Sequence, residues 1–188
     1  LKENTLAANP LFTTSEAKDF LKVDTTADDT LIDNLIKAAT QSCEVYTNRY
    51  FLDTVVTQYA DKWSDINTLY KSPVSSITHI KYYDSDDSLQ TLAGTVYLLD
   101  EVSQPARIGL KPNQSFPNLA DRINAIEVKY TVGYGETSSD VPEGIRQAVL
   151  ITIGNWYENR QTVITGRTAT ELPISSQYLL NQYKVQVC

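Results

Sequence analysis

The segment between residues 140 and 160 constrains the fold more than any other part of the chain. Its apolar residues recur at helical spacing, yet they cover roughly 260° of a helix circumference, whereas a helix on a monomer surface needs a stripe of only about 100°. We therefore predict a helix from Asp140 to about Arg160, with Pro142 in its first turn, that is buried on two sides. A neighbouring subunit could cover the second side, the reading we prefer, or the chain's own sheet and helices could cover both. The predicted inter-subunit residues are Ile145, Val149, Ile153, Trp156 and Tyr157.

Two further helices are predicted before residue 50. Residues 1–12 are polar and contain a proline, so we expect an N-terminal arm. Thr13 and Glu16 have the spacing of a capping box, which predicts a short helix from that point. A second helix of about five turns should begin near Asp28 and end near Asn48. It carries two apolar stripes: one of Leu31, Leu35, Ala38, Ser42 and Val45, and an adjoining one of Ile32, Ile36, Ala39, Cys43 and Tyr46.

The pattern changes from helical to extended between Phe51 and Tyr134. Alternating residues predict several strands, of which residues 125–132 form the clearest because they are rich in β-branched side chains. The acidic run Asp84-Ser85-Asp86-Asp87-Ser88 predicts a hairpin turn. Residues 111–122 read as a long loop, for which we predict a contact between subunits.

The last part of the chain begins with a predicted linker at residues 161–171. An apolar segment follows, and we predict a short helix there that is capped by Ser175 or Ser176. Such a helix is too short to be stable alone, so its apolar residues must dock. They could dock on the chain's own core, or on another subunit or protein, which we prefer because a linker precedes them. The predicted docking residues are Leu172, Pro173, Ile174, Tyr178, Leu179, Leu180 and Tyr183.

The length of 188 residues and an apolar content of 41% are typical of one folded domain. We predict an α+β fold with an N-terminal helical pair, a central and mostly antiparallel β region, a long C-terminal helix packed with the N-terminal helices, and an extended C-terminal arm. The predicted divisions are an arm at 1–12, one domain at 13–160, and a linker with a docking arm at 161–188.

The charge pattern argues against a general nucleic-acid binder. The net charge is −7, whereas such binders obtain affinity mainly from lysine and arginine on phosphates. Residues 1–160 hold 14 basic and 22 acidic side chains, so an acidic body precedes a nearly neutral tail. No apolar stretch approaches the ~18–20 residues that span a bilayer, and we expect no membrane partner.

Residues that could carry chemistry are few, and we predict no catalytic site, no metal site and no cofactor. The chain has a single histidine, His79, which lies in a predicted strand, so two histidines cannot form a zinc site in one copy of this chain. Cys43 and Cys188 lie far apart, which favours assembly in a reducing cytoplasm over a disulfide framework. The turn of Asp84, Asp86 and Asp87 begins like a calcium loop but lacks the glycine and the glutamate that such a loop needs.

The order helix, helix, sheet, helix and apolar tail resembles the head–tail connector proteins of tailed bacteriophages and gene transfer agents, also called adaptor or head-completion proteins. The resemblance extends over about residues 13–184, and each of its strings is short. They lie at residues 15–24, 29–49, 73–84, 97–100, 105–108, 128–135, 141–148, 156–160 and 172–183. The hairpin turn often carries Asp-Gly in such proteins, and Asp86-Asp87 stands in its place here.

The resemblance implies a structural virion protein rather than an enzyme. Such a subunit forms a ring, commonly of twelve copies, in the virion neck between the portal and the tail terminator or stopper, after assembly in the host cytoplasm. The ring lines the channel through which double-stranded DNA leaves. On this reading residues 172–184 form a portal-docking arm, and Asp84, Asp86 and Asp87 form an acidic turn that faces the channel or the tail.

Two alternatives from other classes remain open at the level of the sequence. One is a small, hydrolase-like enzyme whose site is dispersed along the chain. The other is a protein-binding module that acts as a monomer.

Overall fold

The computed structural model describes residues 2–5, 9–159 and 172–185 and has mixed helices and antiparallel sheets, which confirms the predicted α+β class. Its residues group into two compact units. Of the described residues, 2–5, 53–134 and 185 form the strand unit, and 9–52, 135–159 and 172–184 form the helical unit. The predicted boundaries of one domain at 13–160 stay a prediction, because compactness does not test whether the units fold independently.

The strand unit is built on a five-stranded antiparallel sheet in the order β1-β2-β7-β3-β4. The strands are β1 (Lys2–Thr5), β2 (Thr54–Ala60), β3 (Val74–Tyr83), β4 (Leu89–Thr91) and β7 (Ile126–Val132). Side chains of β7 alternate between buried and half-buried, with Ile126, Val128, Tyr130 and Val132 facing the core. This period-2 alternation agrees with the strand that the β-branched residues predicted here.

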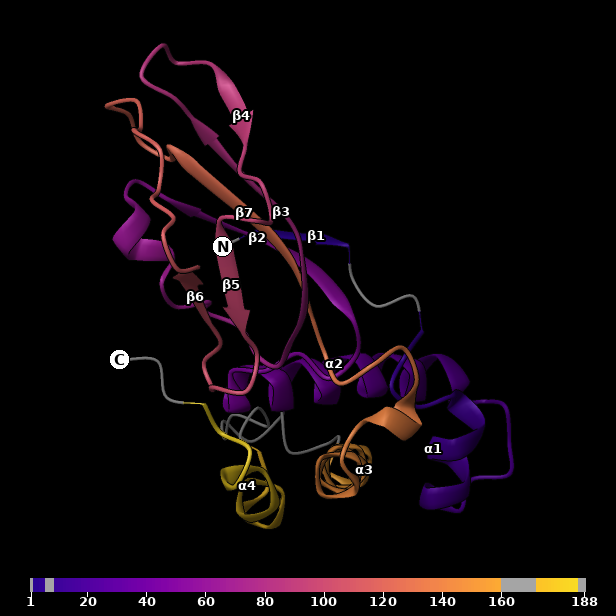
Figure 1. Cartoon of the computed structure of the whole chain (residues 1–188). Coiled ribbons are helices and arrows are strands. Elements are labelled where there is room, and N and C mark those ends of the chain that lie inside the picture. The colour runs from indigo at the N-terminus through magenta and orange to yellow at the C-terminus, as the bar shows by residue number, and fades with distance from the viewer. Residues whose placement is uncertain (1, 6–8, 160–171, 186–188) are drawn as a thin grey trace. The chain divides into compact units, whose positions relative to one another are not determined.

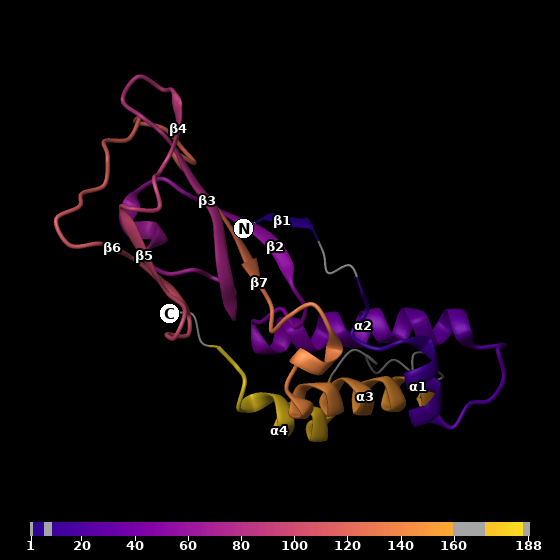
Figure 2. The ribbon, with the colours of Figure 1, turned by 45° about the vertical axis from the view of Figure 1, so that its right-hand side comes forward.

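One face of this sheet is covered from within the strand unit. A separate hairpin of β5 (Tyr97–Asp100) and β6 (Arg107–Leu110) lies on that side, together with the 3-10 helix η1 (Trp63–Ile66) (Figures 1 and 2). The fully buried Gln58 side chain donates from Nε2 to the Thr68 carbonyl oxygen at 3.1 Å. Its Oε1 accepts from the Tyr70 amide at 3.1 Å and the Tyr130 hydroxyl at 3.3 Å. The Gln58 side chain thus holds residues 68–70, which we call the covering segment, to the sheet.

Residues 84–88 lie between β3 and β4, and Asp84 and Ser88 are hydrogen-bonded to each other, so the loop they close has three residues. The Asp87 amide donates to the Asp84 carbonyl oxygen, and the Asp84 amide donates to the Ser88 carbonyl oxygen. Asp87 has a φ of 56°, the left-handed conformation in which such hairpins usually place glycine. Asp84 Oδ1 accepts from the amides of Asp86 and Ser88, both at 3.0 Å. These hydrogen bonds stabilise the turn, which contains no glycine.

The helical unit begins with α1 (Thr14–Leu21) and α2 (Asp29–Thr47). The predicted capping box is confirmed: Thr13 Oγ1 accepts from the Glu16 amide, and the Glu16 carboxylate accepts from the Thr13 amide. The α2 helix ends at Thr47, and its C-cap, Asn48, has a φ of 56°, a left-handed conformation that asparagine tolerates. Of the two predicted stripes of α2, the one with Ile32, Ile36, Ala39 and Cys43 is buried at these residues, and we call it the inner stripe.

The long predicted helix is α3 (Glu143–Glu158), which starts three residues later than expected. The preceding residues form a 3-10 turn, η2 (Ser138–Asp140), and Pro142 occupies the N-cap. Proline has no amide hydrogen to donate, so its ring is best tolerated at a helix start. α3 packs against α1, α2 and the last helix, α4 (Ile174–Asn181) (Figures 1 and 2).

The N-terminal arm differs from its prediction in two ways. Residues 2–5 form β1, which pairs antiparallel with β2. Leu11 and Phe12 are 2% exposed, so the end of the predicted arm belongs to the core of the chain. Four residues give too short a pattern to predict a strand, because β1 exists only through pairing with a distant strand.

Candidate interaction surfaces

The C-terminal helix α4 is docked on the chain's own helical unit. Leu180 is fully buried, and Leu172 is 8% exposed. The Thr152 hydroxyl donates to Ser176 Oγ at 3.0 Å, and the Ser176 hydroxyl lies 3.0 Å from the Ala148 carbonyl oxygen. The prediction that Ser175 or Ser176 caps this helix is therefore wrong: Pro173 holds the N-cap position, and the Ser176 hydroxyl packs against α3.

The end of α4 is also held by polar contacts. The Tyr46 hydroxyl of α2 donates to Asn181 Oδ1 at 2.7 Å, and Arg49 Nε donates to the Tyr183 carbonyl oxygen. Gly144 of α3 lies under the Tyr183 ring, where an added Cβ would be 3.0 Å from the hydroxyl oxygen. Both Leu179 and Tyr183 are half-buried. Docking on the chain's own core, the alternative we did not prefer, is thus what this structure contains.

Two residues of the predicted docking segment remain exposed. Ile174 is 85% exposed and Tyr178 is 80% exposed. They are four residues apart on one helix, so their side chains lie on the same face of α4. This apolar pair, Ile174 and Tyr178, is the part of the segment that is free to meet another molecule.

The predicted inter-subunit residues of α3 divide into two groups. Ile145, Val149 and Ile153 are fully buried. Because the chain's own helices cover their faces, these side chains cannot also contact a neighbouring subunit, and we withdraw them as interface residues. Trp156 and Tyr157 are half-buried, and the Tyr157 hydroxyl donates to Asp28 Oδ2 at 2.6 Å.

The other predicted stripe of α2 is more exposed than the inner stripe, and we call it the outer stripe. Leu31, Leu35 and Ser42 are half-buried, Ala38 is exposed, and Val45 is 71% exposed. This outer stripe carries apolar surface at helical spacing that the described part of the chain only partly covers.

The acidic turn is exposed at Asp86 and Asp87, whereas Asp84 is half-buried. Hydrogen bonds from the Ser88 amide, the Gln90 side chain and the Asp86 amide hold the pKa of the Asp84 carboxyl below its ordinary value. Asp87 pairs with Arg122 at 2.8 Å, and the Arg122 guanidinium lies 3.7 Å from the centre of the Tyr83 ring. Arg122 therefore partly neutralises the Asp87 carboxylate, whereas the Asp86 carboxylate is exposed.

The loop at 111–122 is anchored to its own unit. The rings of Trp63 and Phe116 are stacked, with centres 4.5 Å apart, and Trp63 Nε1 donates to the Pro117 carbonyl oxygen at 2.8 Å. Residues 112–115 are exposed. The predicted contact between subunits is untested, and only the exposed half of the loop is available for it.

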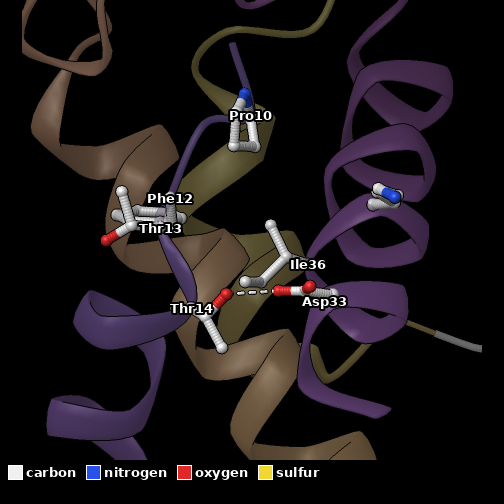
Figure 3. A pocket seen from close by; sticks show the side chains of 7 residues that line it. Pro10, Phe12, Thr13, Thr14, Asp33 and Ile36 are labelled. Atoms are coloured by element: carbon white, nitrogen blue, oxygen red, sulfur yellow. Dashed lines mark hydrogen bonds between the residues drawn. The ribbon is translucent and has the colours of Figure 1, made fainter. Parts of the chain in front are cut away.

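An open pocket of about 370 Å³ lies where the chain enters α1 and faces α2 (Figure 3). The Thr14 hydroxyl points across it and donates to Asp33 Oδ1. The lining residues are Pro10, Phe12, Thr13, Thr14, Asp33, Ile36 and Lys37. They include no histidine or cysteine, and the one carboxylate is already hydrogen-bonded, so this pocket offers no convergent set of catalytic groups.

Groups that could bind metal do not converge in the part of the chain that the structure describes. There, no three histidine, cysteine, aspartate or glutamate side chains lie close enough to hold an ion. His79 Nε2 lies 2.9 Å from Glu127 Oε1 across neighbouring strands. Among the described residues, no helix has the length and apolar character of a membrane span.

Cys43 should be unreactive in the folded protein. Its side chain is fully buried on α2, and burial raises the pKa of the thiol to about 12. Since the thiolate is the nucleophile, we expect iodoacetamide to modify Cys43 at neutral pH about a thousandfold more slowly than after unfolding. Peptide mapping by mass spectrometry would follow Cys43 separately from Cys188. Equal labelling rates in the native and the denatured chain would contradict this burial.

Comparison with known proteins gives one family and several structures. Residues 10–185 match the family described as Head completion protein. No curated protein sequence matched significantly. A chain from "Neck of empty GTA particle computed with C6 symmetry" and one from "Virion of native gene transfer agent (GTA) particle" each have a TM-score of 0.75 and 21% sequence identity. A chain from "Neck of native GTA particle computed with C12 symmetry" has a TM-score of 0.72 and 21% identity.

These structural matches extend over 100% of this chain and 97% of the matched chains. At 21% identity the likeness concerns the fold. The family match is independent of it and covers nearly the whole sequence. The chain belongs to the head completion protein family.

Proposed function

We propose that this protein is a structural adaptor subunit of the head–tail connector, the neck of a phage or of a gene transfer agent particle. Its copies form a ring that joins the portal to the tail or its stopper and lines the DNA exit channel. The observation that carries the proposal is the family match over residues 10–185. The fold shared with chains of gene transfer agent necks, over nearly their full length, supports it further.

The ring is proposed to have twelve subunits, a number in keeping with the C12 symmetry named for one related neck. The interface would use surface that the chain itself leaves open. On α2 this is the outer stripe, where Val45 is 71% exposed, and on α3 it is the half-buried pair Trp156 and Tyr157. The acidic turn with Asp86 and Asp87 would face the channel or the tail, where exposed carboxylates repel phosphate.

An enzymatic role is not favoured. The family is named for head completion, and the pocket of Figure 3 holds no convergent acid, base and nucleophile. A monomeric binding module is likewise less consistent with a fold found in particles whose necks were computed with C6 and C12 symmetry.

The portal contact is proposed to lie on the exposed pair of α4, Ile174 and Tyr178, rather than on the whole segment 172–184. Leu172 and Leu180 are buried, so removing the segment would also damage the core. A double substitution of exposed residues is the cleaner test because it leaves the docked face of α4 intact.

We expect Ile174→Ser with Tyr178→Ser to weaken binding to the portal ring at least about tenfold, since apolar anchors at an interface centre dominate its affinity. Co-sedimentation with portal would measure the affinity, and circular dichroism would verify the fold. Val102→Ser is the matched control, because Val102 is 88% exposed but lies in the strand unit. Undiminished binding by the double variant would reject the portal surface, whereas a wild-type chain that binds no portal would reject the adaptor function itself.

A further inference from the structure

The second face of the five-stranded sheet carries a different set of residues from the covered face. On the covered face Gln58 bonds to the segment at residues 68–70, and Tyr82 lies 5.5 Å from the Trp63 ring. Side chains in a strand alternate between faces, so the neighbours of these residues in β2, β3 and β7 lie on the other side. No other strand or helix among the described residues of the strand unit covers that side (Figures 1 and 2).

Cross-strand pairing aligns basic residues on this second face. One row runs Lys2, Thr57, Lys129 and His79 through β1, β2, β7 and β3. The next runs Tyr59, Glu127, Lys81 and Thr91. Neighbouring strands are about 4.8 Å apart, so Lys2 and Lys129 stand roughly 10 Å from each other on one row. We call Lys2, Lys81 and Lys129 the lysine face.

The positive charge of the lysine face is largely uncompensated. Glu127 is the one acidic residue in the two rows, and it pairs with His79 at 2.9 Å. None of the ion pairs within residues 2–5, 9–159 and 172–185 involves Lys2, Lys81 or Lys129. Lys2 is exposed, while Lys81 and Lys129 are half-buried, as expected of lysines that lay their methylene stems along the sheet.

The opposite charge is concentrated around α1 and the start of α2. Residues 13–33 hold six acidic and two basic side chains, which amounts to a net charge of −4 out of −7 for the chain. An open pocket of about 440 Å³ lies there, lined by Thr14, Ser15, Lys18, Asp19, Val23, Asp24 and Asp29. Lys18 pairs with Asp29 at 2.7 Å, but Asp19 and Asp24 are exposed and belong to no described ion pair. We call Asp19 and Asp24 the acidic corner.

A closed ring needs two different surfaces that fit each other, because each subunit contacts its neighbours head to tail. Copies with a net charge of −7 repel one another, and a contact that brings opposite charges together locally offsets part of this repulsion. Resting on the ring proposed above, we propose that the lysine face of one copy docks against the acidic corner of the next. The partner is therefore a second copy of this chain, and the contact is electrostatic.

The test reverses the charges on each surface and then on both. Lys81→Glu with Lys129→Glu should raise the protein concentration at half-assembly at least about tenfold, since like charges would then face each other. Asp19→Lys with Asp24→Lys should do the same. The chain that carries all four substitutions restores opposite charges across every interface, so it should assemble close to the wild-type concentration. Native mass spectrometry, with and without the portal ring, would measure assembly.

Lys62→Glu is the matched control, because Lys62 is an exposed lysine of the same unit that lies outside the sheet. Unchanged assembly by either reversed pair, or failure of the fourfold variant to recover with its fold intact, would overturn the inference while leaving the adaptor function standing. If the lysine variants instead lost salt-dependent binding to duplex DNA and still formed rings, the face would bind phosphate and not a neighbour. Absence of any wild-type ring, with or without portal, would reject the proposed function and this contact together.

Discussion

Replacing Gln58 by leucine should destabilise the protein by about 3 to 5 kcal/mol, although leucine is apolar and similar in size. Gln58 is fully buried in β2, and its amide group bonds to Thr68, Tyr70 and Tyr130. Leucine would remove the Gln58 hydrogen bonds of two backbone groups and one of the hydrogen bonds of the Tyr130 hydroxyl, and an unsatisfied buried group costs about 1–3 kcal/mol.

Guanidinium unfolding followed by circular dichroism would measure the loss. Gln114→Leu makes the same chemical change at an exposed loop position, and it should alter the unfolding free energy by less than about 0.5 kcal/mol. If both variants were equally stable, the Gln58 amide would not hold the covering segment to the sheet as the geometry requires.

The second large effect is expected in α4. Leu180→Ala should cost about 2 to 4 kcal/mol, because it leaves a cavity beneath a fully buried side chain. Ile174→Ala removes an aliphatic side chain of similar size from the same helix, yet Ile174 is 85% exposed, and its loss should cost less than about 0.5 kcal/mol.

Thermal unfolding of the two variants would compare the faces of one helix directly. A large difference means that α4 is part of the folded core, with one face left for a partner. Equal and small losses would mean that α4 detaches in solution, as the sequence reading of a free docking arm assumed.

Local sequence patterns anticipated the helices well. The capping box at Thr13 and Glu16 acts within one turn, so its hydrogen bonds depend on no distant residue. The inner stripe of α2 and the alternation in β7 were similarly readable, since periodicity reflects which side of an element is apolar. The strands β1, β5 and β6 were missed because four residues carry too short a pattern.

The candidate surfaces were harder to predict. The apolar residues around most of α3 predicted a helix buried on more than one side. At Ile145, Val149 and Ile153 other helices of the same chain bury it. The amount of apolar surface on a helix can be predicted from its sequence, but the element that buries this surface cannot. The same limit applied to the tail, where Leu180 and Tyr178 are both apolar and two residues apart, yet one is buried and the other 80% exposed.

By itself, then, the sequence determined the mixed α+β class, the positions of the main helices, the acidic turn and the family resemblance, because each rests on short-range pattern or on residue identity. Only the tertiary structure decided that the lysines of three strands share one sheet face, and that α4 docks on its own chain with Ile174 and Tyr178 outward. Those outcomes depend on register and on packing between segments more than a hundred residues apart, such as Tyr46 and Asn181. Local propensity does not encode such pairings, whereas the free energy of burying two surfaces together selects them.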